Sequence, residues 1–267
     1  MQDLGIVISA GGQSICQKGL WGGKNEFTQE AKLYYPVSGQ GWAGIGEKII
    51  RLRSGHLYLI PPHVRISFGT PSEIVIDWLH FNLQSLSLDV RLGSLAKIHL
   101  FSKAVTTRWT PVCGLIERFM RERSTHDAFQ IQAMLLELVG LTLMRLPQED
   151  PQALAARERL VPAVQFLDAQ AVKHPSLNDI ARTVNLSPEH FHRLFRAVFH
   201  TTPHQYAEAR CMTLAKSLLA EGLLSVTEVA ERCGYGDPFY FSRVFRRYFG
   251  VNPGRVRRGL VILGPKP

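Results

Sequence analysis

Short segments in which hydrophobic and polar residues alternate occupy the N-terminal part of the chain. They are rich in β-branched and aromatic residues, and turn-forming pairs such as Ser38-Gly39 and Pro61-Pro62 separate them. The segments lie at residues 31–37, 47–52, 56–61, 64–68 and 74–83. Strands at this spacing, with no helical stretch between them, predict a small antiparallel barrel or sandwich.

The hydrophobic pattern becomes helical further along the chain. Residues 111–122 and 128–146 repeat hydrophobic positions every three or four residues. The segment 147–152 is polar and contains two prolines, so we place the domain boundary there. The predicted fold class is therefore α+β with two domains. An antiparallel β-barrel with following helices spans residues 1–148, and an all-α domain spans residues 157–260.

An internal repeat organises the all-α part. Residues 177–206 align with residues 226–256, with one extra residue in the second copy. In each copy a short helix ends at Asn185 or Gly234, residue types that tolerate a left-handed backbone. An N-cap residue and a proline then begin a second, amphipathic helix. Two such copies predict two helix-turn-helix motifs, whose second helices fit the major groove of DNA.

The two copies also carry a family resemblance. The first reads LNDIARTVNLSPEHFHRLFR at residues 177–196, and the second reads VTEVAERCGYGDPFYFSRVFRRYFGVNP at residues 226–253. Both resemble the helix-turn-helix motifs of the AraC/XylS family of bacterial transcription regulators, over about residues 157–258. The resemblance implies a seven-helix domain in which a long helix near residues 203–220 joins the motifs. One departure is Val256, where the family often has an aromatic residue.

The outward face of each second helix supplies the candidate DNA contacts. Arginine can bind guanine with two hydrogen bonds, so Arg193 and Arg243 are the first candidates for contact with bases. The alternatives for these two residues are phosphate contact and ion pairing within the protein. Phe239 either packs on thymine methyl groups or covers its own helix. The candidate base-reading residues are Glu189, His192, Arg193, Pro238, Phe239, Ser242 and Arg243. The candidate phosphate contacts are Arg196, Arg246 and Arg247.

The N-terminal part resembles the sensor domains of the same family. The matching stretches are RSGHLYLIPPH at residues 53–63 and WLHFNL at residues 78–83. This implies a cupin-like barrel that binds a small-molecule effector with aromatic and polar side chains. The candidate effector-binding residues are Tyr34, Trp42, His56, His63, Trp78 and His80, part of which we expect to be core. The clustered histidines and glutamate of metal-binding cupins are missing, so no metal site and no cofactor are expected.

The charge of the chain supports a polyanionic partner for the C-terminal half. Residues 1–150 contain 15 lysines and arginines against 13 acidic residues, whereas residues 151–267 contain 16 against 9. Charge alone does not separate DNA from RNA or an acidic membrane surface. The four cysteines show no paired spacing, and no signal peptide or long apolar run is evident, which predicts a cytoplasmic protein without membrane contact.

The sequence therefore predicts a DNA-binding transcription regulator, not an enzyme. We expect a transcription activator that binds a specific DNA sequence and is controlled by a small-molecule effector such as a sugar. The rival classes are a cupin-type enzyme with a bound metal, a DNA repair protein with a reactive cysteine, and a DNA binder without a ligand. We expect the helices over residues 112–146 to form a homodimer; the alternative is that they pack only on the barrel. RNA polymerase is a further candidate partner.

Overall fold

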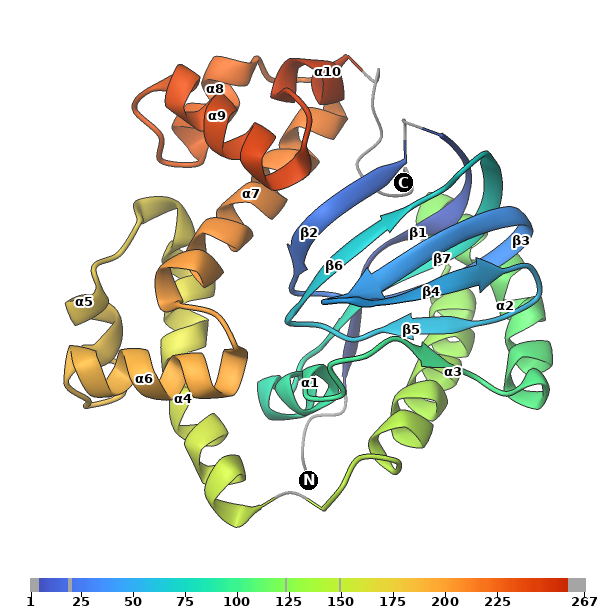
Figure 1. Cartoon of the computed structure of the whole chain (residues 1–267), viewed down its shortest axis with the longest axis horizontal. Helices are drawn as coiled ribbons and strands as arrows, with labels where there is room; N and C mark the ends of the chain where they lie inside the picture. The colour runs from blue at the N-terminus through green and yellow to red at the C-terminus, as the bar shows by residue number, and fades with distance from the viewer. Residues whose placement is uncertain (1–4, 19–20, 123, 149, 259–267) are drawn as a thin grey trace. The chain divides into compact units, whose positions relative to one another are not determined.

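The computed structural model describes residues 5–18, 21–122, 124–148 and 150–258 of the chain. The chain divides into two compact units, with the division between residues 147 and 148. The first unit is built on β-strands and the second of helices (Figure 1). The predicted two-part α+β fold class is confirmed.

The strands of the first unit pair in antiparallel fashion, and one long strand serves two sheets. The strands are β1 (Ile6–Gln17), β2 (Gly22–Thr28), β3 (Ala31–Ile45), β4 (Lys48–Arg53), β5 (Tyr58–Ile60), β6 (Val64–Gly69), β7 (Glu73–Leu83) and β8 (His99–Leu100). The first half of β3 pairs with β5 and β7, and its second half with β4 and β6. A register shift between Pro36 and Ser38, followed by Gly39 with a φ of 78°, separates the halves.

The alternation of side chains along these strands produces two hydrophobic cores. One lies between the sheets and includes Trp21, Tyr34 and Trp78. The other lies between the opposite face of β3 and β7 and the helices, and includes Leu33 and Leu79. The helices of this unit are α1 (Leu86–Gly93), α2 (Lys103–Glu122) and α3 (Thr125–Leu143).

Two predicted boundaries need correction. The helix expected at residues 111–122 begins at Lys103, and Pro111 lies inside it. A proline removes one helical hydrogen bond but does not end a helix whose buried face continues past it. The segment expected to break helix structure at 147–152 contains the start of α4. The Asp150 carboxylate accepts from the Gln152 N–H at 3.1 Å, and Pro151 occupies the first turn.

Seven α-helices and one short 3-10 helix make up the described part of the second unit. They are α4 (Pro151–Gln170), η1 (Ala171–Lys173), α5 (Leu177–Arg182), α6 (Pro188–Phe199), α7 (Pro203–Glu221), α8 (Val226–Arg232), α9 (Pro238–Phe249) and α10 (Pro253–Arg257). The long connecting helix expected near residues 203–220 is α7. Within the described ranges, no helix of either unit is long and apolar enough to cross a membrane.

Candidate nucleic-acid interface and ligand site

The first helix-turn-helix motif consists of α5 and α6. The Ser187 hydroxyl caps α6 by accepting from the His190 N–H at 3.3 Å, and Pro188 follows at the first helical position. Asn185 lies in the turn with a φ of 51°, the left-handed conformation that its residue type tolerates. The predicted roles of these three residues are confirmed.

The second motif consists of α8 and α9, and the backbone of its turn has less space around it than that of the first motif. Ser225 and Glu228 cap α8 reciprocally, with bonds of 2.7 and 3.2 Å. Gly234 in the turn has a φ of 75°, and a Cβ at this position would lie 1.8 Å from the carbonyl oxygen of Val172. Both the backbone angle and the lack of space therefore require glycine.

The close approach at Gly234 joins the second motif to the segment that precedes the first. His174 Nε2 lies 3.2 Å from the Cys233 carbonyl oxygen, and its ring packs edge-on to Tyr235 at 5.0 Å. The residues that follow α4 thus fix the turn between α8 and α9. This contact restrains the second motif relative to the helices around the first.

Each second helix buries one aromatic face and exposes the other. In α6 the buried rings are Phe191, Phe195 and Phe199, and in α9 they are Phe241, Phe245 and Phe249. Neighbouring rings within each set lie 4.4–5.8 Å apart. These stacks hold the two helices rigidly and leave their opposite faces open to solvent.

The predicted base-reading residues lie on these open faces. In α6, Glu189 and Arg193 are exposed and His192 is half-buried. In α9, Phe239 is 83% exposed and Arg243 is exposed. Pro238 and Ser242 are half-buried at the same face. Each helix therefore presents a group of side chains that can reach base edges.

Tyr240 is a candidate that the sequence analysis missed. It is 48% exposed, and the Arg243 guanidinium lies 5.6 Å from the centre of its ring. A cation over an aromatic face is attracted to it, so the ring of Tyr240 favours one orientation of the Arg243 guanidinium on the exposed face of α9. The spacing of three residues on one helix is the signal that could have identified this pair.

The three predicted phosphate contacts have different surroundings. Arg196 and Arg246 are exposed. Arg247 donates to the Glu208 carboxylate of α7 at 2.8 Å, so its guanidinium holds α9 against the connecting helix. Arg196 and Arg246 are therefore the better placed of the three to meet phosphate.

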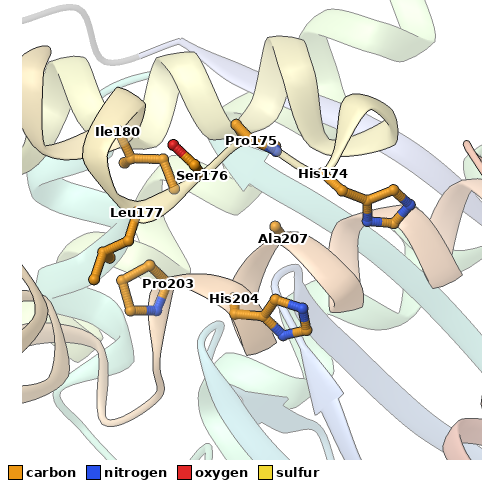
Figure 2. A pocket seen from close by; sticks show the side chains of 8 residues that line it. All are labelled: His174, Pro175, Ser176, Leu177, Ile180, Pro203, His204 and Ala207. Atoms are coloured by element: carbon orange, nitrogen blue, oxygen red, sulfur yellow. The ribbon is translucent and has the colours of Figure 1, made fainter.

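A hollow of ≈ 300 Å³ lies between the starts of α5 and α7. Figure 2 shows the imidazoles of His174 and His204 on one side, and Leu177, Ile180 and Pro203 on the other. Most of the lining is apolar. Across the described ranges, no three side chains of His, Cys, Asp or Glu gather as metal ligands.

Three of the six predicted effector-binding residues lie together between the two sheets of the first unit. Trp78 and His80 have ring centres 4.8 Å apart, and Tyr34 and His80 have ring centres 6.2 Å apart. The Trp78 indole N–H donates to the Ser14 hydroxyl at 3.0 Å. Aromatic faces and hydrogen-bonding groups thus meet in one place, as in small-molecule sites.

The other three predicted effector residues lie elsewhere. Trp42 lies on the opposite face of the sheet, against Gly69. His56 is exposed, with Nδ1 2.9 Å from the Ser54 carbonyl oxygen. His63 is buried against α1, where Nε2 lies 2.7 Å from the Asp89 carboxylate.

We call Tyr34, Trp78 and His80 the inner group. Two charged residues that were not predicted lie beside it. Glu30 Oε2 lies 3.7 Å from His80 Nδ1. Lys32 pairs with His80 across β3 and β7. Burial lowers the pKa of the Lys32 ammonium, and the carboxylates of Glu30 and Glu26 oppose that shift. The alternation of side chains along β3 could have identified Lys32. Residues two apart on a strand share a face, and Tyr34, two residues on, points inward.

Comparisons with known proteins agree with this architecture. A family model described as an AraC-like ligand binding domain matches residues 23–164, and a helix-turn-helix domain model matches residues 180–259. The lactose operon transcription activator of Staphylococcus xylosus is 22% identical over 236 residues, covering 86% of this chain and 84% of that protein. The Msm operon regulatory protein of Streptococcus mutans is 22% identical over 240 residues, covering 85% and 83%.

The fold is also similar to that of a solved structure. The crystal structure of ToxT from Vibrio cholerae superposes with a TM-score of 0.66, at 12% sequence identity. The match covers 95% of this chain and 97% of that one. The likeness shows a shared two-part fold.

Proposed function

This chain belongs to the AraC/XylS family of transcription regulators, and from that premise we propose that it is a sequence-specific activator controlled by a small effector. Its relatives are regulators with helix-turn-helix domains, so it is a regulator and not an enzyme. The observation that carries the proposal is the pair of matching motifs. Each exposes an arginine, Arg193 or Arg243, on a helix with an aromatic buried face.

In this proposal α6 and α9 each enter the major groove of one duplex. Arg243, oriented by Tyr240, donates to a guanine, and Arg193 does the same from α6. Arg196 and Arg246 contact phosphates and set the register of the protein on the DNA. An activator of this kind then recruits RNA polymerase to the neighbouring promoter.

The test replaces Arg243 with alanine. A bidentate arginine–guanine contact contributes about 1–3 kcal/mol of discrimination, so we expect specific affinity to fall about 5- to 150-fold. The measurement is a mobility-shift titration on a duplex that the wild-type protein selects from a random library, with nonspecific DNA in parallel. Binding of the wild-type protein should also weaken steeply with salt, because phosphate contacts release counterions.

The matched control is Arg121→Ala, which removes one positive charge from an exposed site on α2. It should bind both duplexes as the wild-type protein does. Specific binding by Arg243→Ala equal to that of the control would refute the assigned role of Arg243. A flat salt response would argue against groove docking altogether.

The effector site that we propose is the inner group of Tyr34, Trp78 and His80, together with Glu30 and Lys32. Aromatic faces pack on the apolar faces of sugars, and the charged groups can hydrogen-bond to hydroxyls. A sugar is further supported by the relative named for the lactose operon. The remaining predicted residues, Trp42, His56 and His63, are not part of this proposed site.

We also propose that the chain forms a homodimer through α3. Its buried face packs on the sheet through Ile131, Leu135 and Leu138. The opposite face carries an apolar stripe at spacings of three or four residues, although it faces solvent. The stripe consists of Phe129, Ala133, Leu136 and Gly140 of α3 and of Met144, the residue that caps its end; Gly140 is half-buried and the other four are exposed. An exposed apolar face of this length is typical of a protein interface.

A further inference from the structure

Two arginines of β4 project from the outer face of the first unit. Leu52 is completely buried in the core between the sheets. Because successive side chains of a strand point to opposite faces, Arg51 and Arg53 face outward together, and both are exposed. Their Cα atoms are about 6.6 Å apart at the rise of a β-strand. The two guanidinium groups can therefore reach a single ligand.

The backbone that carries these arginines is fixed by one buried side chain. The Tyr58 hydroxyl accepts from the Arg53 N–H at 2.9 Å and donates to the Arg51 carbonyl oxygen at 3.2 Å. Tyr58 itself is only 2% exposed. The phenol thus holds both arginine positions from the core side, which is the support that a binding site needs.

A hollow of ≈ 320 Å³ lies at these arginines. Its lining is Gly39, Gln40, Arg51, Leu52, Arg53 and Ser54. The Ser54 hydroxyl donates to the Gly39 carbonyl oxygen at 3.2 Å, which connects the end of β4 to the bend of β3. The volume is in the range of small-molecule sites.

The positive charge at the hollow is not neutralised. Within the described residues neither guanidinium forms an ion pair. The sequence contains no acidic residue from 48 to 72, and none in the paired strand β3. One acidic residue, Glu73, borders the lining, because its backbone oxygen approaches Gly39. An anion would therefore meet attraction from both arginines.

We propose that this hollow binds the phosphate group of a phosphorylated small molecule. Planar guanidinium groups bind phosphate with paired hydrogen bonds. The Gln40 amide and the Ser54 hydroxyl supply further groups for the rest of the ligand. The site lies on the opposite face of the sheet from the inner effector group, so it is a second site and does not depend on the first.

The experiment measures binding of glucose 6-phosphate and of glucose to the full chain by isothermal titration calorimetry. We expect glucose 6-phosphate to bind more tightly than glucose, because only the phosphorylated sugar can bind at the hollow. The double variant Arg51→Gln/Arg53→Gln should weaken its binding at least about tenfold, or about 1.4 kcal/mol, because the hydrogen bonds from the guanidinium groups to the phosphate are lost. Glucose lacks the phosphate group, so the affinity of the chain for glucose should be the same in the double variant and the wild type.

The control variant is Lys97→Gln/Lys103→Gln, which removes two exposed charges elsewhere in the same unit. It should retain the affinity for glucose 6-phosphate, and the melting temperature of both variants should match the wild type. Equal loss in both variants, or equal affinity for the two sugars in the wild type, would overturn the proposal. So would an effect of the arginine pair on DNA retention without any binding of the phosphorylated sugar.

Discussion

At the scale of single residues, the two turns of the helix-turn-helix motifs differ in how strictly they specify a residue. Asn185 and Gly234 occupy the equivalent left-handed position, with φ of 51° and 75°. An asparagine is tolerated in the first turn. In the second, the Val172 carbonyl oxygen occupies the place of a side chain, so only glycine fits.

Replacing Gly234 with alanine should destabilise the second unit by more than about 2 kcal/mol. The left-handed backbone alone costs an alanine about 1–2 kcal/mol, and the contact with Val172 forces a further backbone movement. Urea unfolding of the full chain, followed by circular dichroism, measures the change. The control is Gly236→Ala two residues away, where no atom lies within 4 Å of an added Cβ. Equal midpoints for the two variants would contradict the argument.

At the scale of elements, α3 is the helix whose two faces are both apolar. Its inner face is explained by the sheet, and two of its acidic residues, Asp127 and Glu137, form ion pairs with α2. The Arg108 guanidinium donates to both oxygens of Glu137 at 2.6 and 2.8 Å, and Arg118 pairs with Asp127. Neither ion pair involves a residue of the stripe from Phe129 to Met144.

The double variant Phe129→Glu/Leu136→Glu tests the proposed dimer. Charges buried at an apolar interface lose hydration without a partner, so we expect the variant to sediment as a monomer while the wild type sediments as a dimer. Sedimentation velocity at micromolar concentration is the measurement. Gln130→Glu adds a charge to the same helix beside the stripe and should leave the dimer intact. A dimer that persists in the double variant would place the interface elsewhere.

At the scale of the whole molecule, regulation requires that the effector and DNA influence each other's binding. If a sugar raises the affinity for the selected duplex by some factor, the duplex must raise the affinity for that sugar by the same factor. This reciprocity does not require knowledge of how the two units are arranged. It makes the effector proposal testable with the intact chain.

A thermal-shift screen with mono- and disaccharides, lactose included, identifies the effector. A ligand at about 100 times its Kd adds about 2.7 kcal/mol, which raises the melting temperature by several degrees. His80→Gln should remove this shift and the effect of the sugar on DNA binding. His56→Gln, an exposed histidine apart from the inner group, should retain both. A shift that survives in His80→Gln would exclude the inner group as the effector site.

The sequence by itself determined the helix-turn-helix repeat, its caps and its left-handed turns. Each of these depends on residues a few positions apart, so the local pattern was sufficient. Ser187, Pro188 and Asn185 take the predicted places because capping and turn geometry are local interactions. The base-reading and phosphate roles remain predictions that the DNA experiments will decide.

Only the tertiary structure decided which side chains meet. Tyr34 and Trp42 are eight residues apart on β3, and strict alternation would put them on one face. The register shift between Pro36 and Ser38 puts Tyr34 inside and Trp42 outside. The pairing of Arg247 with Glu208 likewise joins residues 39 positions apart. Strand register and long-range ion pairs arise from the packing of distant segments, which no local pattern in the sequence specifies.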